Sequence, residues 1–252
     1  MGKPVLGLQV YTVRDSLSAD FAGTLRRVRE VGYDAVELCG TGPYTGAEVK
    51  RLCDDLGLRV AGMHVGLDAL EHDLSGCIAT ARDLGMENLV CPGLPEDRRK
   101  TRDDWLNSAK ALDALGRKCR AQGVYLSYHN HSVEFVRLGG VYALDVLFEN
   151  SSPQNLCSEI DTYWVKHGGA EPVAYIKKYA GRIKILHCKD MAADKDRSFA
   201  EVGNGVLDWQ AIHAAALQAG VEWYCVEQDV CPGDPMESAR LSAQFMRSKL
   251  GL

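Results

Sequence analysis

Short apolar segments alternate with longer amphipathic segments along the whole chain. The short segments are rich in β-branched and other apolar residues, which favour strands. Strands that alternate with helices are typical of βαβ units and a parallel sheet. We therefore predict eight strands, at Val5–Val10, Ala35–Leu38, Arg59–His64, Asn88–Cys91, Val124–His129, Leu156–Asp161, Ile183–His187 and Glu222–Glu227.

The longer segments between these strands predict helices. Four of them end directly before a glycine and a fifth ends one residue earlier, and glycine is the residue that most often follows the last turn of a helix. A strand follows each of these glycines within a few residues, so the joint from helix through glycine to strand recurs. We predict helices at Asp20–Val31, Gly46–Leu56, Asp73–Leu84, Arg102–Ala121, Tyr142–Glu149, Val173–Tyr179, Trp209–Ala219 and Glu237–Lys249.

Two architectures fit this alternation, a closed barrel and an open doubly wound sheet. A dinucleotide-binding open sheet carries the motif G-x-G-x-x-G after its first strand. Here Val5–Val10 is followed by Tyr-Thr-Val-Arg-Asp, which contains no glycine. Eight strands within 252 residues, with no proline- or serine-rich linker, are typical of one eight-fold barrel. We predict an α/β fold, a (β/α)8 TIM barrel, with residues 1–252 as a single domain.

The amino-acid composition and net charge argue against several classes of protein. Apolar residues make up 46% of the chain and charged residues 25%, as in an ordinary globular protein. The net charge of −5 argues against a nucleic-acid partner, and the basic clusters at 26–29 and 98–100 are interpreted as solvated faces. No run of 18 apolar residues predicts a membrane span.

The nine cysteines indicate the cellular compartment. Their number is odd, none forms a C-x-x-C pair, and most lie singly within apolar segments. This pattern predicts buried thiols in a reducing compartment rather than a disulfide framework or a zinc ribbon. The N-terminal residues show no hydrophobic segment of a signal peptide. We expect a cytoplasmic protein.

Ionisable residues gather where the predicted strands end, and barrel enzymes build their active sites at the carboxyl ends of their strands. Carboxylates and imidazoles that converge there suit a divalent ion such as Mn, Mg, Co or Zn. The last four strands each offer one such residue at or just beyond the end. We predict that Glu134, Asp161, His187 and Glu227 ligate one metal ion.

These residues lie within motifs that resemble a known family. The chain is similar from end to end to the xylose-isomerase-like barrel superfamily, whose members are described as sugar phosphate isomerases/epimerases. The likeness is carried by segments 7–15, 32–37, 128–135, 161–164, 186–190 and 202–205. It implies a metal held by Glu, Asp, His and Glu from strands five to eight, a carbohydrate substrate, and the dimers or tetramers common in this family.

The fifth strand departs from that pattern. Ketose 3-epimerases of the family carry a glutamate at the end of this strand, where this chain has His129. Glu134 lies five residues later and reaches the metal if the loop curls back. Either Glu134 is the ligand and His129 contacts the substrate, or His129 ligates directly. We favour Glu134, because hard divalent ions prefer carboxylate oxygen.

The resemblance implies enolisation of a sugar. The metal polarises a carbonyl and a base removes the proton on the neighbouring carbon. We assign catalysis to Glu227, His129 and Lys189, with Lys189 neutralising the oxyanion; its structural alternative is a surface ion pair with Asp190. Return of the proton completes isomerisation or epimerisation. Loss of a β-substituent instead makes the enzyme a lyase or hydratase acting on a 3-keto-glycoside or a keto-inositol.

Histidines and aromatic residues near the strand ends are candidates for substrate contacts. We assign His64, His131, Trp164 and Tyr11 to substrate binding, and His131 together with His129 motivates the lyase alternative, because an imidazole exchanges protons near neutral pH. The sequence has no P-loop and no dense arginine cluster that would bind a phosphate group. Two other hypotheses are a DNA-repair endonuclease of the same superfamily, which usually needs three zinc ions and more His and Asp, and a non-catalytic barrel.

Overall fold

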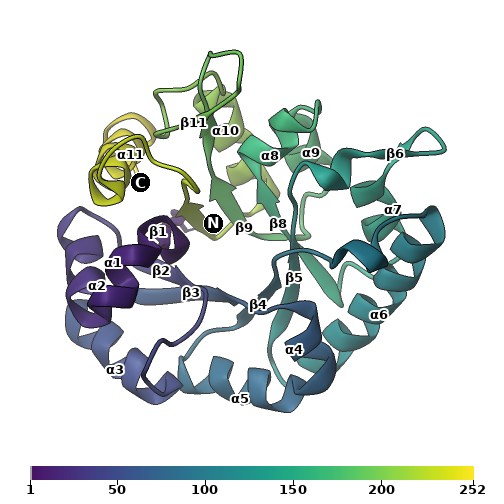
Figure 1. Cartoon of the computed structure of the whole chain (residues 1–252), viewed down its shortest axis with the longest axis horizontal. Coiled ribbons are helices and arrows are strands. Elements are labelled where there is room, and N and C mark those ends of the chain that lie inside the picture. The colour runs from purple at the N-terminus through teal and green to yellow at the C-terminus, as the bar shows by residue number, and fades with distance from the viewer. Residues whose placement is uncertain (1) are drawn as a thin grey trace.

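Eight parallel strands close into a barrel in the computed structural model, which describes residues 2–252 (Figure 1). Around the barrel the strands follow the order β1-β12-β9-β8-β5-β4-β3-β2. All eight predicted strands are confirmed, with ends that differ by at most one residue. Their bounds are β1 Val5–Gln9, β2 Ala35–Leu38, β3 Arg59–His64, β4 Asn88–Cys91, β5 Tyr125–His129, β8 Leu156–Asp161, β9 Ile183–Cys188 and β12 Trp223–Val226.

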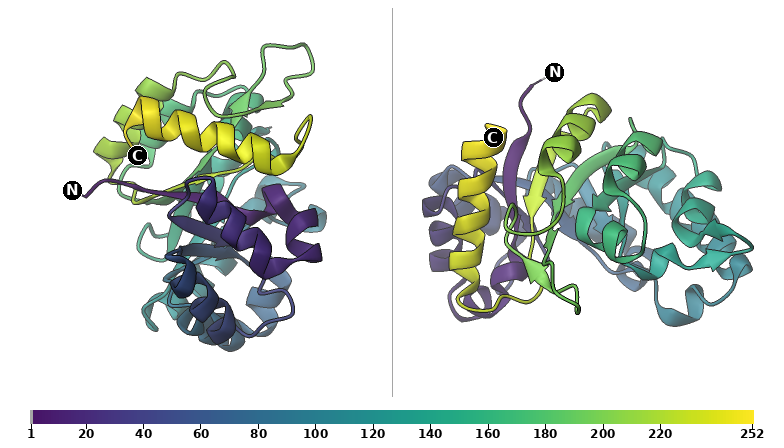
Figure 2. Two further views of the ribbon diagram at one scale, coloured as in Figure 1. Left: turned by 90° about the vertical axis from the view of Figure 1, so that its left-hand side faces the viewer. Right: turned by 90° about the horizontal axis from the view of Figure 1, so that it is seen from above.

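The predicted helices form a ring outside the barrel (Figures 1 and 2). Their ends carry the expected signals: Thr45 and Glu48 form a reciprocal capping box at the start of α3, and Gly57 follows the helix in the left-handed conformation. The bounds are α2 Phe21–Glu30, α3 Gly46–Leu56, α5 Leu74–Asp83, α6 Arg102–Arg120, α7 Ala143–Glu149, α9 Pro172–Lys178, α10 Trp209–Ala219 and α11 Pro235–Leu250.

Several short elements that follow the strands were not predicted. They are too short for a hydrophobic period to distinguish them from loop. Most of them lie on the carboxyl side of the barrel strands, where they surround the mouth. They are the helices η1 Val10–Val13, α1 Arg14–Ala19, α4 Leu67–His72, η2 Glu96–Arg98, η3 Val133–Phe135 and α8 Thr162–His167, and the hairpins β6 Arg137–Leu138 with β7 Val141–Tyr142 and β10 Asp190–Met191 with β11 Phe199–Ala200.

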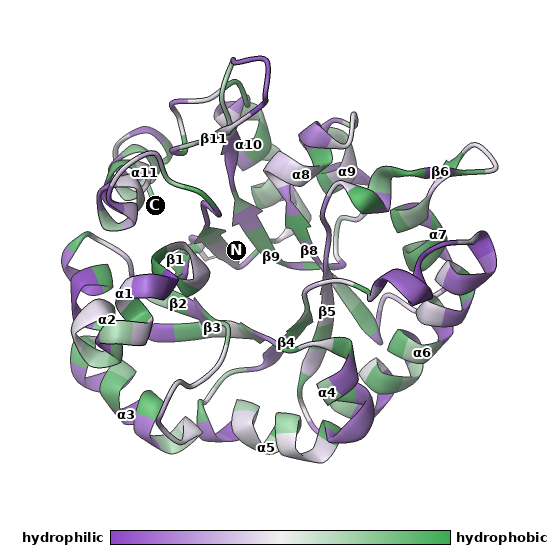
Figure 3. Ribbon diagram, viewed as in Figure 1, coloured by the Kyte–Doolittle hydropathy of each residue, from purple (hydrophilic) through white to green (hydrophobic). Residues whose placement is uncertain are grey.

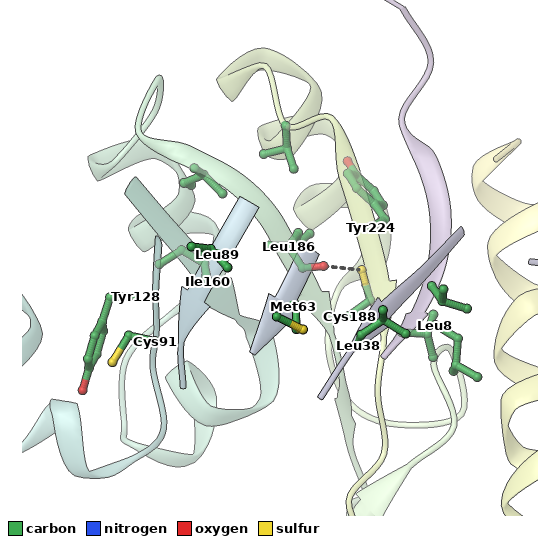
Figure 4. Packing of buried hydrophobic residues seen from close by; sticks show 14 of the residues in the cluster. Leu8, Leu38, Met63, Leu89, Cys91, Tyr128, Ile160, Leu186, Cys188 and Tyr224 are labelled. Atoms are coloured by element: carbon green, nitrogen blue, oxygen red, sulfur yellow. Dashed lines mark hydrogen bonds between the residues drawn. The ribbon is translucent and has the colours of Figure 1, made fainter. Parts of the chain in front are cut away.

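Apolar side chains form two separate cores. On six strands the even-numbered residues, among them Leu8, Ile160 and Leu186, pack outward with the apolar stripes of the helices (Figures 3 and 4). A smaller cluster fills the barrel interior and contains Ala35, Ala61, Val90, Ile185, Trp223 and Cys225. Because successive side chains of a strand face opposite sides, the odd-numbered residues beyond this cluster reach the barrel mouth. The interior is thus apolar at its base and polar above.

The cysteines agree with the prediction of buried, unpaired thiols. All nine cysteines are free, and six of them are buried. Among residues 2–252, no helix combines the length and the hydropathy needed to span a bilayer.

We expect Arg182 to be a major contributor to stability. Its guanidinium is buried and donates hydrogen bonds to the carbonyl oxygens of Phe148, Ser151 and Leu156, at 2.6, 2.9 and 2.7 Å. It thereby joins the end of α7 to the start of β8. Arg182→Met keeps the apolar stem but leaves these acceptors unpaired, so urea denaturation should show a loss of about 3 kcal/mol. The exposed control Arg26→Met should change stability by less than about 0.5 kcal/mol; equal losses would contradict the role of Arg182.

A carboxylate that joins α2 to α11 predicts a pH dependence of stability. Asp34 accepts from Arg29 at 2.5 Å and from Arg247 at 2.6 Å. Burial raises the pKa of Asp34, but the hydrogen bonds and charges of the two arginines outweigh it and lower the pKa below its ordinary value. The carboxylate therefore stabilises the fold above its ordinary pKa, and this contribution disappears as the pH falls through the lowered value. Asp34→Asn should be less stable than the parent at pH 7, with a difference that shrinks below about pH 4; a constant difference in urea titrations would contradict this.

Candidate metal centre and substrate cavity

A cavity of about 470 Å³ opens at the carboxyl ends of the barrel strands. A cavity of this size accommodates a small organic ligand. Imidazoles form part of its wall, together with Lys189, which follows β9, and Glu227 and Asp229, which follow β12. The lining residues are Tyr11, Cys39, His64, Pro92, His129, His131, Lys189, Glu227 and Asp229.

Two overlapping groups at the wall and base of this cavity have the composition and spacing of metal ligands. The first contains His129, Asp161, His187 and Glu227, each with one ligand atom within 4.8 Å of the others. The second shares His129 and His187 and adds His64 and Glu159. The first group contains three of the four predicted ligands, and it comes from the four adjacent strands β5, β8, β9 and β12.

The donor set of the first group fits a divalent ion. Asp161 is fully buried, and its Oδ2 atom has no hydrogen-bond partner, although the Lys189 ammonium lies 3.3 Å away. Its other oxygen accepts from the backbone N–H of Trp164 at 2.8 Å. Burial raises the pKa of Asp161 to about 7 despite the opposing charge of Lys189. A buried carboxylate oxygen without a hydrogen bond is the kind of group that a metal ion satisfies.

The structure does not bring Glu134 to this group. Both of its oxygens are engaged, one with the Tyr128 hydroxyl at 2.7 Å and the other with the backbone N–H of His131 at 2.8 Å. The reason is local: η3 turns the chain after β5, so Glu134 folds back under its own loop. Its role is to hold the segment that carries His131. The geometry therefore favours His129, the alternative ligand from the fifth strand.

Lys189 is an interior residue with only 1% of its surface exposed. Its ammonium lies 2.5 Å from Glu227 and 2.9 Å from Asp229, in addition to Asp161. The surface ion pair with Asp190 that the sequence offered as an alternative is wrong, because alternation along the chain turns Asp190 away from the cavity.

Asp190 instead organises a loop outside the barrel. Its carboxylate accepts from the backbone N–H groups of Gly203, Gly205 and Leu207, and from the indole N–H of Trp209 at 2.7 Å. A substitution here would leave these donors without an acceptor and release the loop.

The predicted substrate-binding residues separate into two sets. Tyr11, His64 and His131 line the cavity, and Tyr11 lies at its exposed rim. Burial, with the charge of Lys189, lowers the pKa of His131 to about 4, so its ring is neutral at neutral pH. Trp164 does not line the cavity: its ring packs with Tyr163 in an aromatic cluster of α8 and lies behind His131, with centroids 5.4 Å apart.

The sequence analysis assigned no role to three acidic residues that the structure places near the centre. Glu37 on β2 and Glu159 on β8 are fully buried beneath the metal group, and Asp229 stands beside Lys189. A signal was available for the first two. Each is a glutamate inside a predicted strand, between Val36 and Leu38 for Glu37 and next to Ile160 for Glu159, and a buried carboxylate is rare unless it is paired.

The chain belongs to the family described as "Xylose isomerase-like TIM barrel", whose model matches residues 25–249. An inosose dehydratase of Bacillus cereus (strain AH820) is 25% identical over 203 residues, which cover 72% of this chain and 67% of that protein. A sugar phosphate isomerase/epimerase structure from Parabacteroides distasonis ATCC 8503 has 25% identity and a TM-score of 0.83, with 98% of both chains covered. The IOLI protein with a bound zinc atom superposes with a TM-score of 0.76 at 14% identity, over 96% of each chain.

Proposed function

We propose that this protein is a divalent-metal-dependent sugar isomerase/epimerase that acts through an enediolate of a keto- or aldo-sugar. The observation that carries the proposal is the junction of the buried group His129, Asp161, His187 and Glu227 with a sugar-sized cavity. Membership of the xylose-isomerase-like family and the likeness to a sugar phosphate isomerase/epimerase support it. When bound, the metal supplies Lewis-acid polarisation of the sugar carbonyl.

Side chains of this protein would remove the proton and stabilise the negative charge. Glu227 lines the cavity and accepts from His187, at 3.1 Å, and from Lys189. Burial raises the pKa of Glu227, but the charges of Lys189 and His187 outweigh it and lower the pKa well below its ordinary value. Glu227 is therefore ionised and placed to take the proton next to the carbonyl. The Lys189 ammonium stabilises negative charge that develops on the sugar oxygen.

A second candidate function is a lyase or dehydratase on the same kind of substrate. The asymmetry of the cavity favours it: its two carboxylates, Glu227 and Asp229, both follow β12. The other ionisable residues that line it are Lys189 and three histidines, His64, His129 and His131. An epimerase requires proton transfer on both faces of the substrate carbon. A neutral His131 can instead donate a hydrogen bond to a departing oxygen, and the related inosose dehydratase is consistent with this use.

Solvent deuterium distinguishes the candidates. We would incubate the metal-loaded protein in deuterium oxide with ketohexoses, a keto-inositol and a 3-keto-glycoside, and follow products by mass spectrometry and NMR. An isomerase/epimerase should place deuterium on the carbon next to the carbonyl of an otherwise intact sugar. Release of water or of an aglycone would favour the lyase. Turnover with complete retention of protium would exclude the enediolate in both candidates.

A further inference from the structure

Two carboxylates form a floor beneath the metal group. Glu159 precedes Asp161 by two residues on β8, so both side chains face the barrel interior, with Glu159 one layer deeper. Glu37 reaches the same layer from β2. Both are fully buried, and neither is needed for the ligand set or for proton transfer in the proposed function.

Nitrogen atoms of three imidazoles lie close to a single oxygen of this floor. Glu159 Oε1 lies 2.9 Å from His64 Nε2, 2.9 Å from His129 Nδ1 and 3.0 Å from His187 Nε2. Glu37 Oε2 adds a contact of 2.5 Å to the same His187 nitrogen. An ionised carboxylate only accepts, so His64 Nε2 and His187 Nε2 donate to the floor. His129 Nδ1 lies close to Glu159 Oε1 but makes no hydrogen bond in this structure.

The opposite nitrogens of two of these rings face upward. His129 Nε2 and His187 Nδ1 each lie 3.9 Å from the unpaired Asp161 Oδ2, and His187 Nδ1 lies 3.1 Å from Glu227 Oε2. A neutral imidazole has one N–H and one lone pair. If the N–H points at the floor, the lone pair is available to a metal only at the upper nitrogen, and at His187 Nδ1 a metal would replace the proton that Glu227 accepts in this structure.

We propose that Glu159, assisted by Glu37, is a positioning residue that fixes the metal-binding nitrogens as Nε2 of His129 and Nδ1 of His187. The proposal rests on the metal centre of the proposed function. Carboxylates behind ligating histidines orient the ring and raise its basicity, and their loss typically weakens metal binding about 10- to 100-fold.

The second candidate group makes the opposite prediction. There a metal would bind Glu159 directly and use Nδ1 of His129 and Nε2 of His187. Each group retains a buried carboxylate oxygen without a hydrogen-bond partner, Asp161 Oδ2 in the first, upper group and Glu159 Oε2 in the second, lower one. Only the upper group adds a second carboxylate, Glu227, which lines the cavity. Because hard divalent ions prefer carboxylate oxygen, we place the metal in the upper group.

Nitrogen-15 NMR of the zinc-loaded protein tests the assignment directly. Long-range correlations between ring protons and ring nitrogens identify which nitrogen carries zinc and which keeps its proton. We expect zinc at Nε2 of His129 and Nδ1 of His187. The reverse pattern, or no zinc bound, would overturn the proposal. The predicted pattern in a protein that converts no sugar would leave the inference intact and count only against the proposed function.

Substitutions test the positioning role through zinc affinity, measured by competition with a chromophoric chelator. Glu159→Gln should retain one zinc per chain with affinity lowered about 10- to 100-fold, and Glu37→Gln should have a smaller effect. Ser158→Ala is the matched control, because Ser158 is the adjacent buried residue on the same strand. It should leave the affinity unchanged.

Two results would contradict the positioning role. Unchanged zinc affinity and unchanged ring assignments in Glu159→Gln would show that the floor does not act on the histidines. Complete loss of zinc in Glu159→Gln with retention in Asp161→Asn would show that Glu159 is itself a ligand. If Glu159→Gln does not fold, the assignment in the parent protein and the affinity of Glu37→Gln still decide the question.

Discussion

Asp161→Asn should remove the metal and with it nearly all activity. Asparagine has the shape of aspartate, and its carbonyl oxygen can keep the hydrogen bond from the Trp164 N–H that begins α8. The atom that replaces the unpaired Oδ2 is an amide nitrogen, which offers a metal no lone pair. Loss of a direct ligand should lower metal affinity more than about 100-fold, beyond the effect of an outer carboxylate. Loss of Lewis-acid stabilisation worth several kcal/mol corresponds to about a 1,000-fold fall in kcat/KM.

Metal content by elemental analysis and kcat/KM on the best substrate would measure both effects. His72→Gln is a suitable control, because this exposed histidine on α4 contacts the backbone oxygen of Asp68 and no residue of the cavity. It should retain full metal content and activity. Full metal content in Asp161→Asn would exclude the proposed ligand set, and normal activity without metal would exclude metal-dependent chemistry.

Lys189→Met should produce the largest combined effect on stability and activity. The ammonium is buried among the carboxylates of Asp161, Glu227 and Asp229, and the side chain of methionine neutralises none of them. Removal of one partner from a buried ionic group costs about 3–5 kcal/mol. A metal ion would restore part of the missing positive charge. The melting temperature of Lys189→Met should therefore rise more on addition of metal than that of the parent.

Activity of the metal-loaded Lys189→Met should fall about 100- to 1,000-fold in kcat, as expected when one group that stabilises an oxyanion is lost. Lys166→Met is the control: its ion pair with Glu171 is exposed, so it should cost less than about 1 kcal/mol and leave kcat unchanged. An unaltered kcat in Lys189→Met would reduce Lys189 to a structural role. An equal rise in melting temperature for parent and variant would contradict the charge argument.

The barrel was predictable because its signals are local. Strand bounds follow from apolar runs, and glycines such as Gly57 and Gly220 end helices in a conformation that other residues adopt at a cost. The helices α1, α4 and α8 were not predictable, because six residues are too few for a period to emerge. Tertiary contacts stabilise them rather than their own sequences: α1 packs on α2, α4 on α5, and α8 on β8 and β9.

From the sequence it was possible to predict only which strand ends contribute residues to the candidate site. The sequence brought Asp161, His187 and Glu227 to one end of the barrel, and the structure places them together. It favoured Glu134 because a carboxylate is the better ligand for a hard ion. In the structure, the turn at η3 and a hydrogen bond from the Tyr128 hydroxyl keep the Glu134 carboxylate away from the metal group. The spacing of residues along the sequence does not predict such hydrogen-bond partners. It also does not predict that Lys189 is an interior residue rather than a surface residue.

The loop whose conformation depends on Asp190 limits which residues of this barrel can be changed by engineering. A Cβ atom at Gly205 would lie 2.2 Å from the Asp190 carboxylate and 2.5 Å from a backbone oxygen, and one at Gly203 would lie 2.1 Å from Phe245. Libraries of loop variants should therefore leave Asp190, both glycines and Trp209 unchanged. Residues 193–198 of the adjoining hairpin loop are exposed, and diversity can be concentrated there. A graft that transfers the loop without its aspartate would lose the acceptor that shapes it.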